Sequence, residues 1–189
     1  MSGSKFNPST IILLAVVVLV SIFRIAAPHS DNFKEIANFS AVGAIALFGG
    51  AYFNNNLKAY GFPLLVLLLS DIFIAQTSGF GFFYGGWYWT YIAFVMMVFA
   101  SKQLLKKVNA QSLVLSTIVI TLIHWVVSDI SAMYVPGLYP TTLAGFGACL
   151  IAAIPFELKF LYGTLVYGSV MFGVMALYPS LSLKKSVNA

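Results

Sequence analysis

Charged residues are scarce in this sequence of 189 residues, since Asp, Glu, Lys and Arg together make up only 8% of it. Soluble domains average about 25% charged residues, and a surface with so few charges aggregates in water. Hydrophobic residues make up 60% of the chain, so lipid is the solvent that suits most of its surface. The composition therefore excludes a soluble globular protein and predicts an all-α integral membrane protein, with one transmembrane domain over residues 1–189.

Residues and motifs that carry common chemistry are also scarce. The single cysteine, Cys149, excludes an internal disulfide, and two histidines are too few for a histidine-based metal centre. No glycine-rich phosphate loop, no His-Glu-x-x-His motif and no Gly-x-Ser-x-Gly elbow occurs. We therefore expect no cofactor, no metal and no enzymatic activity. An intramembrane enzyme stays as an alternative, and it would need His124 within hydrogen-bonding reach of Asp129 or Asp71.

Apolar segments fill most of the chain. The first follows Lys5 and continues past Arg24, without the cleavage site of a signal peptide. Proline ends or kinks a helix, so Pro155 predicts a break before the last segment. We expect six transmembrane helices with an extra half-helix or surface helix before the last span. The expected spans cover residues 10–27, 39–51, 60–76, 89–105, 112–134 and 158–177, and the half-helix covers 142–154.

The lysines determine the expected orientation, because cytoplasmic segments of membrane proteins are rich in Lys and Arg. With six spans and a cytoplasmic N-terminus, seven lysines are cytoplasmic and only Lys34 is external. The seven are Lys5, Lys58, Lys102, Lys106, Lys107, Lys184 and Lys185. A seventh span at residues 142–154 would change this count to five against three. We therefore expect both termini in the cytoplasm, and no nucleic acid as a partner.

Nearly all ionisable residues of the expected helices fall in the outer half of the membrane in this topology. A charge at the bilayer centre costs about 2.5–3.5 kcal/mol, so such residues usually face a cavity or one another. The aromatic loop at residues 80–89 lies on the same side. We therefore expect an outward-facing pocket for a small molecule. Its candidate binding residues are Arg24, His29, Asn38, Asp71, Trp87, His124, Asp129, Tyr139 and Glu157.

A structural explanation is available for several of these residues. Arg24 and Lys159 have stems long enough to reach the membrane interface. Asp71 and Asp129 would form ion pairs with these two cations. His124 is compatible with an interhelical hydrogen bond, and the aromatic run at residues 87–89 is typical of an interfacial belt. The location of these residues on one side is stronger support for a pocket than any single residue.

Glu157 and Lys159 open the last expected span. A negative charge is favoured in the first turn of a helix, where the helix dipole is positive. Residues two positions apart point to different faces of a helix. Because lysine has the longer stem for reaching the interface, we expect Glu157 to face the pocket and Lys159 to face the interface.

Three stretches carry a resemblance to a known family. They are the glycine-rich Asn38–Phe53, Leu69–Asp71, and Tyr139–Phe156, which ends in Ile-Pro-Phe. They resemble small bacterial membrane proteins related to the S components of energy-coupling factor (ECF) transporters. The resemblance implies a substrate-binding subunit of a vitamin or micronutrient importer in the bacterial inner membrane, with its ligand near the outer face. It also implies a transmembrane coupling subunit and two cytoplasmic ATPases as partners, although some S components work alone.

The resemblance leaves the ligand and the partner surface open. A solitary lineage of S components for cobalamin has a histidine after the first helix and an aspartate at the end of the third, as His29 and Asp71 are here. No cysteine follows the third helix as a cobalt ligand, so cobalamin is only one candidate. S components often carry an Ala-x-x-x-Ala face on their first helix, where the coupling subunit binds. This face is missing here, and small residues instead recur at Ala144, Ala148 and Ala152. The main alternative is a scaffold subunit of an envelope assembly, which would need no outward pocket.

Overall fold

The computed structural model describes residues 15, 22, 41–78 and 85–177, and every regular element in these residues is helical. In chain order the elements are α2 (Val42–Tyr52), α3 (Asn56–Ser78), α4 (Tyr88–Leu104), α5 (Ala110–Ile123), the π-helix η3 (His124–Ser128), the 3-10 helix η4 (Asp129–Tyr134) and α6 (Leu143–Leu177). The first expected span, at residues 10–27, lies almost entirely outside the described residues. The expected all-helical fold is confirmed for the part of the chain that the structure describes.

Three described segments are long and apolar enough to cross a membrane, judged by length and composition. They are Asn56–Phe73 within α3, Ala110–Tyr134, and Leu143–Leu177, which is α6. Their mean hydropathies are 1.3, 2.0 and 1.7. The 17 residues of α4 extend over about 26 Å at 1.5 Å per residue, slightly less than the ~30 Å hydrocarbon core of a bilayer. The structure therefore supports a membrane protein with three candidate spanning helices among its described residues.

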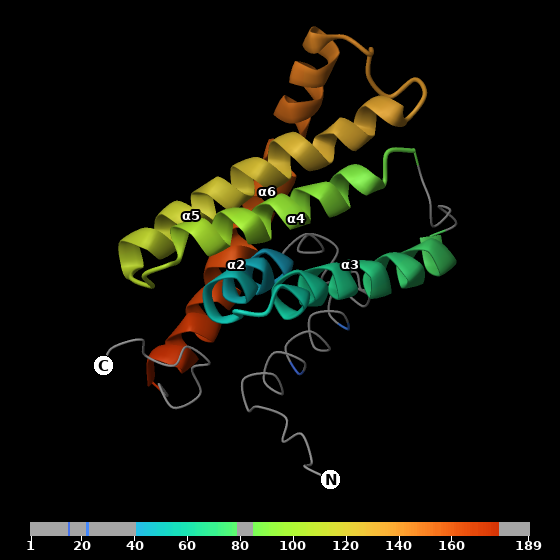
Figure 1. Cartoon of the computed structure of the whole chain (residues 1–189). Helices are drawn as coiled ribbons and strands as arrows, with labels where there is room; N and C mark the ends of the chain where they lie inside the picture. The colour runs from blue at the N-terminus through green and yellow to red at the C-terminus, as the bar shows by residue number, and fades with distance from the viewer. Residues whose placement is uncertain (1–14, 16–21, 23–40, 79–84, 178–189) are drawn as a thin grey trace.

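The short helix α2 forms the centre of the bundle. The helices α3, α4 and α5 lie side by side, whereas α6 crosses behind them (Figure 1). The central helix contacts α3, α4 and α6, and nine of its 11 residues are buried. A helix that is surrounded by other elements is hydrophobic on all faces, and α2 contains no charged residue. Burial of α2 thus explains why its sequence shows no polar face.

Three glycines allow the neighbouring helices to approach α2 closely. A Cβ atom at Gly43 would overlap with the hydroxyl of Thr164 on α6. At Gly49 it would lie 2.8 Å from the carbonyl oxygen of Ala59 on α3, and at Gly50 it would lie 2.9 Å from a backbone nitrogen of α4. Small residues permit such close helix packing in membrane proteins. The glycine-rich helix α2 therefore approaches three different helices closely.

The expected break at Pro155 is wrong, because α6 continues through this residue as one helix of 35 residues. There is consequently no separate half-helix at residues 142–154. Proline removes one backbone hydrogen bond, and the long helical segments on both sides of it keep theirs. Pro155 is also exposed, so its ring does not disturb the core. At roughly 52 Å, α6 is longer than a bilayer core is thick, so it must tilt or extend beyond the core.

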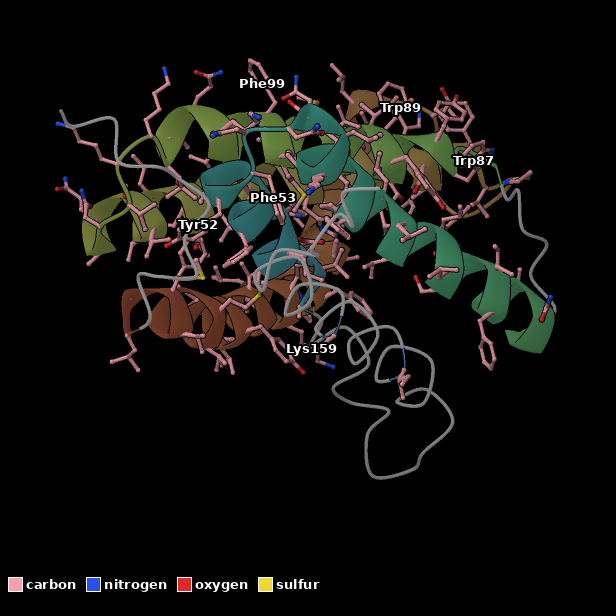
Figure 2. All side chains as sticks on the ribbon, turned by 60° about the horizontal axis from the view of Figure 1, so that its bottom comes forward. Tyr52, Phe53, Trp87, Trp89, Phe99 and Lys159 are labelled. Carbon is pink, nitrogen blue, oxygen red and sulfur yellow. The ribbon has the colours of Figure 1, made fainter. Side chains whose placement is uncertain are left out.

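The two ends of the bundle differ in chemistry. The basic end consists of the start of α3, the end of α4 and the start of α5, and it carries Lys58, Lys102, Lys106 and Lys107. There, Nζ of Lys102 donates hydrogen bonds to Oδ1 of Asn56 at 2.8 Å and to the carbonyl of Phe53 at 3.4 Å. The opposite, aromatic end carries Trp87, Tyr88, Trp89 and Tyr134, and Figure 2 shows the two tryptophans together. All but one of the described lysines thus lie at one end.

Candidate functional site

The helix that begins at Ala110 changes its winding where its polar residues begin. The regular α5 ends at Ile123, and it is followed by the five-residue π-helix η3 and the six-residue 3-10 helix η4. π-Helical segments are rare, and they occur frequently at functional sites. This irregular stretch begins with His124 and also carries Ser128 and Asp129. The change of winding therefore singles out these side chains as candidates for function.

His124 on η3 and Glu157 on α6 form a hydrogen-bonded pair inside the bundle. The Nδ1 atom of His124 lies 2.9 Å from Oε1 and 3.0 Å from Oε2 of Glu157, which is only 8% exposed. An ionised carboxylate only accepts hydrogen bonds, so Nδ1 is the donor to an ionised Glu157. The imidazole also stacks on the ring of Phe160, with ring centroids 4.1 Å apart and an interplanar angle of 8°. Together the acid and the aromatic ring fix the orientation of the imidazole.

Asp129 completes what we call the His–acid cluster, which consists of His124, Asp129 and Glu157. It lies within electrostatic range of both other residues, and its Oδ2 atom is buried without a hydrogen-bond partner among the described residues. Burial of an unpaired polar atom is costly, and such atoms in native proteins call for an explanation. Among the described residues, no three His, Cys, Asp or Glu side chains are placed to hold a metal ion. A ligand that donates hydrogen bonds would satisfy this oxygen.

A second polar group lies between α3 and α4. The hydroxyl of Tyr91 donates a hydrogen bond of 2.9 Å to Oδ2 of Asp71, and the indole of Trp87 packs edge-on against Tyr91 with centroids 5.3 Å apart. Tyr91 was not among the residues expected at the site. The spacing of four residues between Trp87 and Tyr91 places the two rings on one helix face, and it is the signal that would have identified Tyr91.

Both described cavities lie between α6 and the segment formed by α5 and η3, and α2 also lines the smaller one. The larger, of about 250 Å³, is lined by Ile118, Thr121, Leu122, Trp125, Ile154, Glu157, Leu158 and Leu161. The smaller, of about 200 Å³, is lined by Leu47, Ala110, Leu113, Val114, Thr117, Thr164, Leu165, Gly168, Ser169 and Phe172. Asp71, Trp87 and Asp129 line neither of them. The described cavities therefore do not unite the expected residues in one pocket.

The remaining expected residues are distributed as follows. Arg24, His29 and Asn38 lie outside the described residues. Tyr139 is half-buried in the connection between η4 and α6. Lys159 is half-buried and forms no described ion pair with Asp129, and Figure 2 shows it on the opposite side of the molecule from Phe99. The structure therefore brings together His124, Asp129 and Glu157, and separately Asp71 and Trp87.

The chain belongs to a family of unknown function (DUF6580), whose match covers residues 4–186. No curated protein and no solved structure matches it. The match includes all the helices described above, so the whole bundle is the family's domain. A function must accordingly be argued from the chemistry of the site.

Proposed function

We propose that this family member is the substrate-binding membrane subunit of a vitamin or micronutrient importer, similar to an ECF S component. The observation that supports this most is the His–acid cluster inside apolar helices. Buried acids in a membrane protein are costly, and they commonly mark the path or binding site of a substrate. The π-helix at the same place adds to this, since it is a further departure from the most stable helix geometry.

We assign ligand contacts to the two acids of the cluster. Glu157 and Asp129 accept hydrogen bonds from the ligand, and His124 orients Glu157 through their hydrogen bond. Asp71, held by Tyr91, and Trp87 flank the route from the aromatic end of the bundle. The proposal retains Arg24, His29, Asn38 and Tyr139 as further contacts at the outer side.

We assign six membrane crossings to the chain, with the basic end in the cytoplasm and the aromatic end outside. The four lysines of the basic end support this orientation, because the positive-inside rule counts residues next to the spans. The described α2 extends over only about 16 Å, roughly half of a bilayer core. Its crossing therefore requires the preceding residues as well. A short helix is tolerated at membrane depth here because protein surrounds α2 on all sides.

Import against a gradient requires an energy source, and the sequence contains no nucleotide-binding motif. A coupling subunit with cytoplasmic ATPases would supply it. Ala144, Ala148 and Ala152 are all exposed on α6, four residues apart, and small residues in this pattern allow another helix to approach closely. We assign the contact with the coupling subunit to this face of α6.

A membrane scaffold subunit is the second candidate. It is favoured by the chemistry of the larger described cavity, whose wall is almost entirely apolar. A scaffold has no need for acids inside its helices, however. An intramembrane enzyme is supported less, because His124 hydrogen-bonds Glu157 rather than Asp129 or Asp71. The hydroxyl of the neighbouring Ser128 donates to the backbone carbonyl of His124 rather than to its imidazole.

Native mass spectrometry of the gently purified protein tests the proposal. We expect a small molecule to co-purify with the chain, and its occupancy to fall in Glu157→Gln and Asp129→Asn. Lys159→Gln is the matched control, since it removes a charge two residues from Glu157 outside the cluster. Equal occupancy in Glu157→Gln and Lys159→Gln, with all variants folded, would refute the site assignment. A wild-type protein without any bound molecule would favour the scaffold.

A further inference from the structure

The four lysines of the basic end have no acidic neighbour among the described residues. Of the three described acids, Asp71 lies about 22 Å along α3 from Asn56, at 1.5 Å per residue. The other two belong to the His–acid cluster, which the 14 residues of α5 separate from the basic end by roughly 21 Å. Salt screens exposed charges beyond about 8 Å, so these acids do not offset the charge of the lysines. The described part of the chain therefore leaves four positive charges at the basic end without a counter-charge.

One of these lysines is held in place by the fold. Nζ of Lys102, in the last turn of α4, donates hydrogen bonds to Oδ1 of Asn56 and to the carbonyl of Phe53, so it ties α4 to the turn between α2 and α3. An ammonium group has three donors, and these two bonds use two of them. The third donor and the positive charge remain for an anion. Because the side chain is already ordered, binding of an anion there costs less entropy than binding at a mobile lysine.

Exposed apolar side chains lie directly beside the lysines. Leu57 precedes the exposed Lys58 at the start of α3, and its side chain is 82% exposed. Phe99 lies about one turn before Lys102 on α4 and is 58% exposed, and Figure 2 shows it at the edge of the molecule. Large exposed apolar side chains mark surfaces that contact a partner or a membrane. The surface of the basic end thus combines positive charge with apolar groups.

In a membrane the basic end lies at the surface, because two of the three candidate spans begin there, Asn56–Phe73 and Ala110–Tyr134. Lysines that flank a span lie at the level of the lipid headgroups, whereas apolar side chains of the span face hydrocarbon. An anionic phospholipid has the same arrangement, since its phosphate lies above its own acyl chains. A soluble acidic protein would match the charges but would leave the apolar side chains without a partner.

We propose that the basic end is a binding site for an anionic phospholipid. The phosphate accepts a hydrogen bond from Lys102, and the three exposed lysines around it supply a positive potential. An acyl chain lies against Phe99 on the exposed face of α4. The lysines flank the spans in either orientation of the chain, so the inference is independent of the proposed importer function and of the proposed topology.

Native mass spectrometry of the full chain tests the site. The protein is delipidated in a neutral detergent and titrated with dioleoyl-phosphatidylglycerol, and the bound and free species give a Kd for each binding event. The matched probe is dioleoyl-phosphatidylcholine, which has the same acyl chains and no net charge. We expect saturable binding of phosphatidylglycerol, with a Kd at least about tenfold lower than that of phosphatidylcholine.

Substitutions of single lysines locate the site. Lys106→Gln should raise the Kd for phosphatidylglycerol about fivefold, the usual contribution of one lysine near a membrane surface. Lys102→Gln should raise it further, because it also removes the ordered donor. Lys159→Gln is the matched control, since it removes the same charge from the opposite side of the molecule (Figure 2), and it should leave the Kd unchanged. Thermal unfolding of each variant separates a lost site from a misfolded protein, and the exposed Lys106 is not part of the packed bundle.

Equal affinity for the two lipids would overturn the inference. Equal weakening by Lys106→Gln and Lys159→Gln would also overturn it, because the affinity would then follow the net charge of the whole chain rather than the basic end. Inorganic phosphate at the concentration of the lipid should not displace phosphatidylglycerol. Complete displacement by phosphate would show that the acyl chains contribute nothing, and would equally refute a lipid site.

Discussion

Tyr91 on α4 donates a hydrogen bond of 2.9 Å to Asp71 on α3, across a helix pair that is otherwise largely apolar. The bond gives the carboxylate a partner within the bundle, where water is scarce. We expect Tyr91→Phe to lower the free energy of unfolding by about 1 kcal/mol, the usual value of an interhelical hydrogen bond in membrane proteins. Chemical unfolding in detergent measures it. Tyr162→Phe, at an exposed position on α6, is the control and should have no effect.

The pair of His124 and Glu157 should be energetically coupled. Glu157→Ala and His124→Ala each leave a polar group buried without its partner. We expect each substitution to lower the free energy of unfolding, measured by chemical unfolding in detergent, by about 3–5 kcal/mol. The double variant should cost clearly less than the sum, since it leaves neither group unpaired. Lys159→Ala, which lies on the same helix but outside the pair, should change stability by about 0.5 kcal/mol or less. Additive effects of the two single substitutions would contradict the coupling.

The glycines of α2 and α3 should respond differently to the same substitution. In Gly50→Ala the new Cβ would lie 2.5 Å from Cβ of Ser101, so α4 must move. We expect the free energy of unfolding to fall by about 1–3 kcal/mol. In Gly61→Ala the new Cβ meets nothing within 4 Å, and the better helix propensity of alanine should stabilise α3 by about 0.5–1 kcal/mol. Thermal unfolding in detergent compares them. A stabilising Gly50→Ala would show that α2 and α4 are less closely packed.

Cysteine labelling in intact cells tests the orientation. In a Cys149→Ala background, the Asn56→Cys variant places a thiol at the basic end, and Gly137→Cys places one in the loop between η4 and α6 at the other end. With the lysines in the cytoplasm, a membrane-impermeant maleimide should label position 137 in intact cells and position 56 only after lysis. Labelling of position 56 from outside would reverse the proposed topology.

The helical fold and the prediction of a membrane protein both follow from the sequence alone. Few charges and long apolar runs leave lipid as the only suitable solvent, and lipid in turn requires a backbone that satisfies its own hydrogen bonds. The glycines of α2 are visible in the sequence as positions where another helix can approach closely, but which helix meets each of them is not. Spacing indicated that Glu157 and Lys159 would face differently, since two residues along a helix correspond to about half a turn.

Only the tertiary structure decided which polar residues meet. His124 and Glu157 are 33 residues apart, and nothing in their local sequence specifies that η3 packs against α6 at this register. The continuity of α6 through Pro155 likewise depends on context, because proline removes one hydrogen bond and the rest of a long helix outweighs that loss. Local propensity sets the helices of this protein, whereas the packing of α6 against η3 brings the acid and the imidazole together.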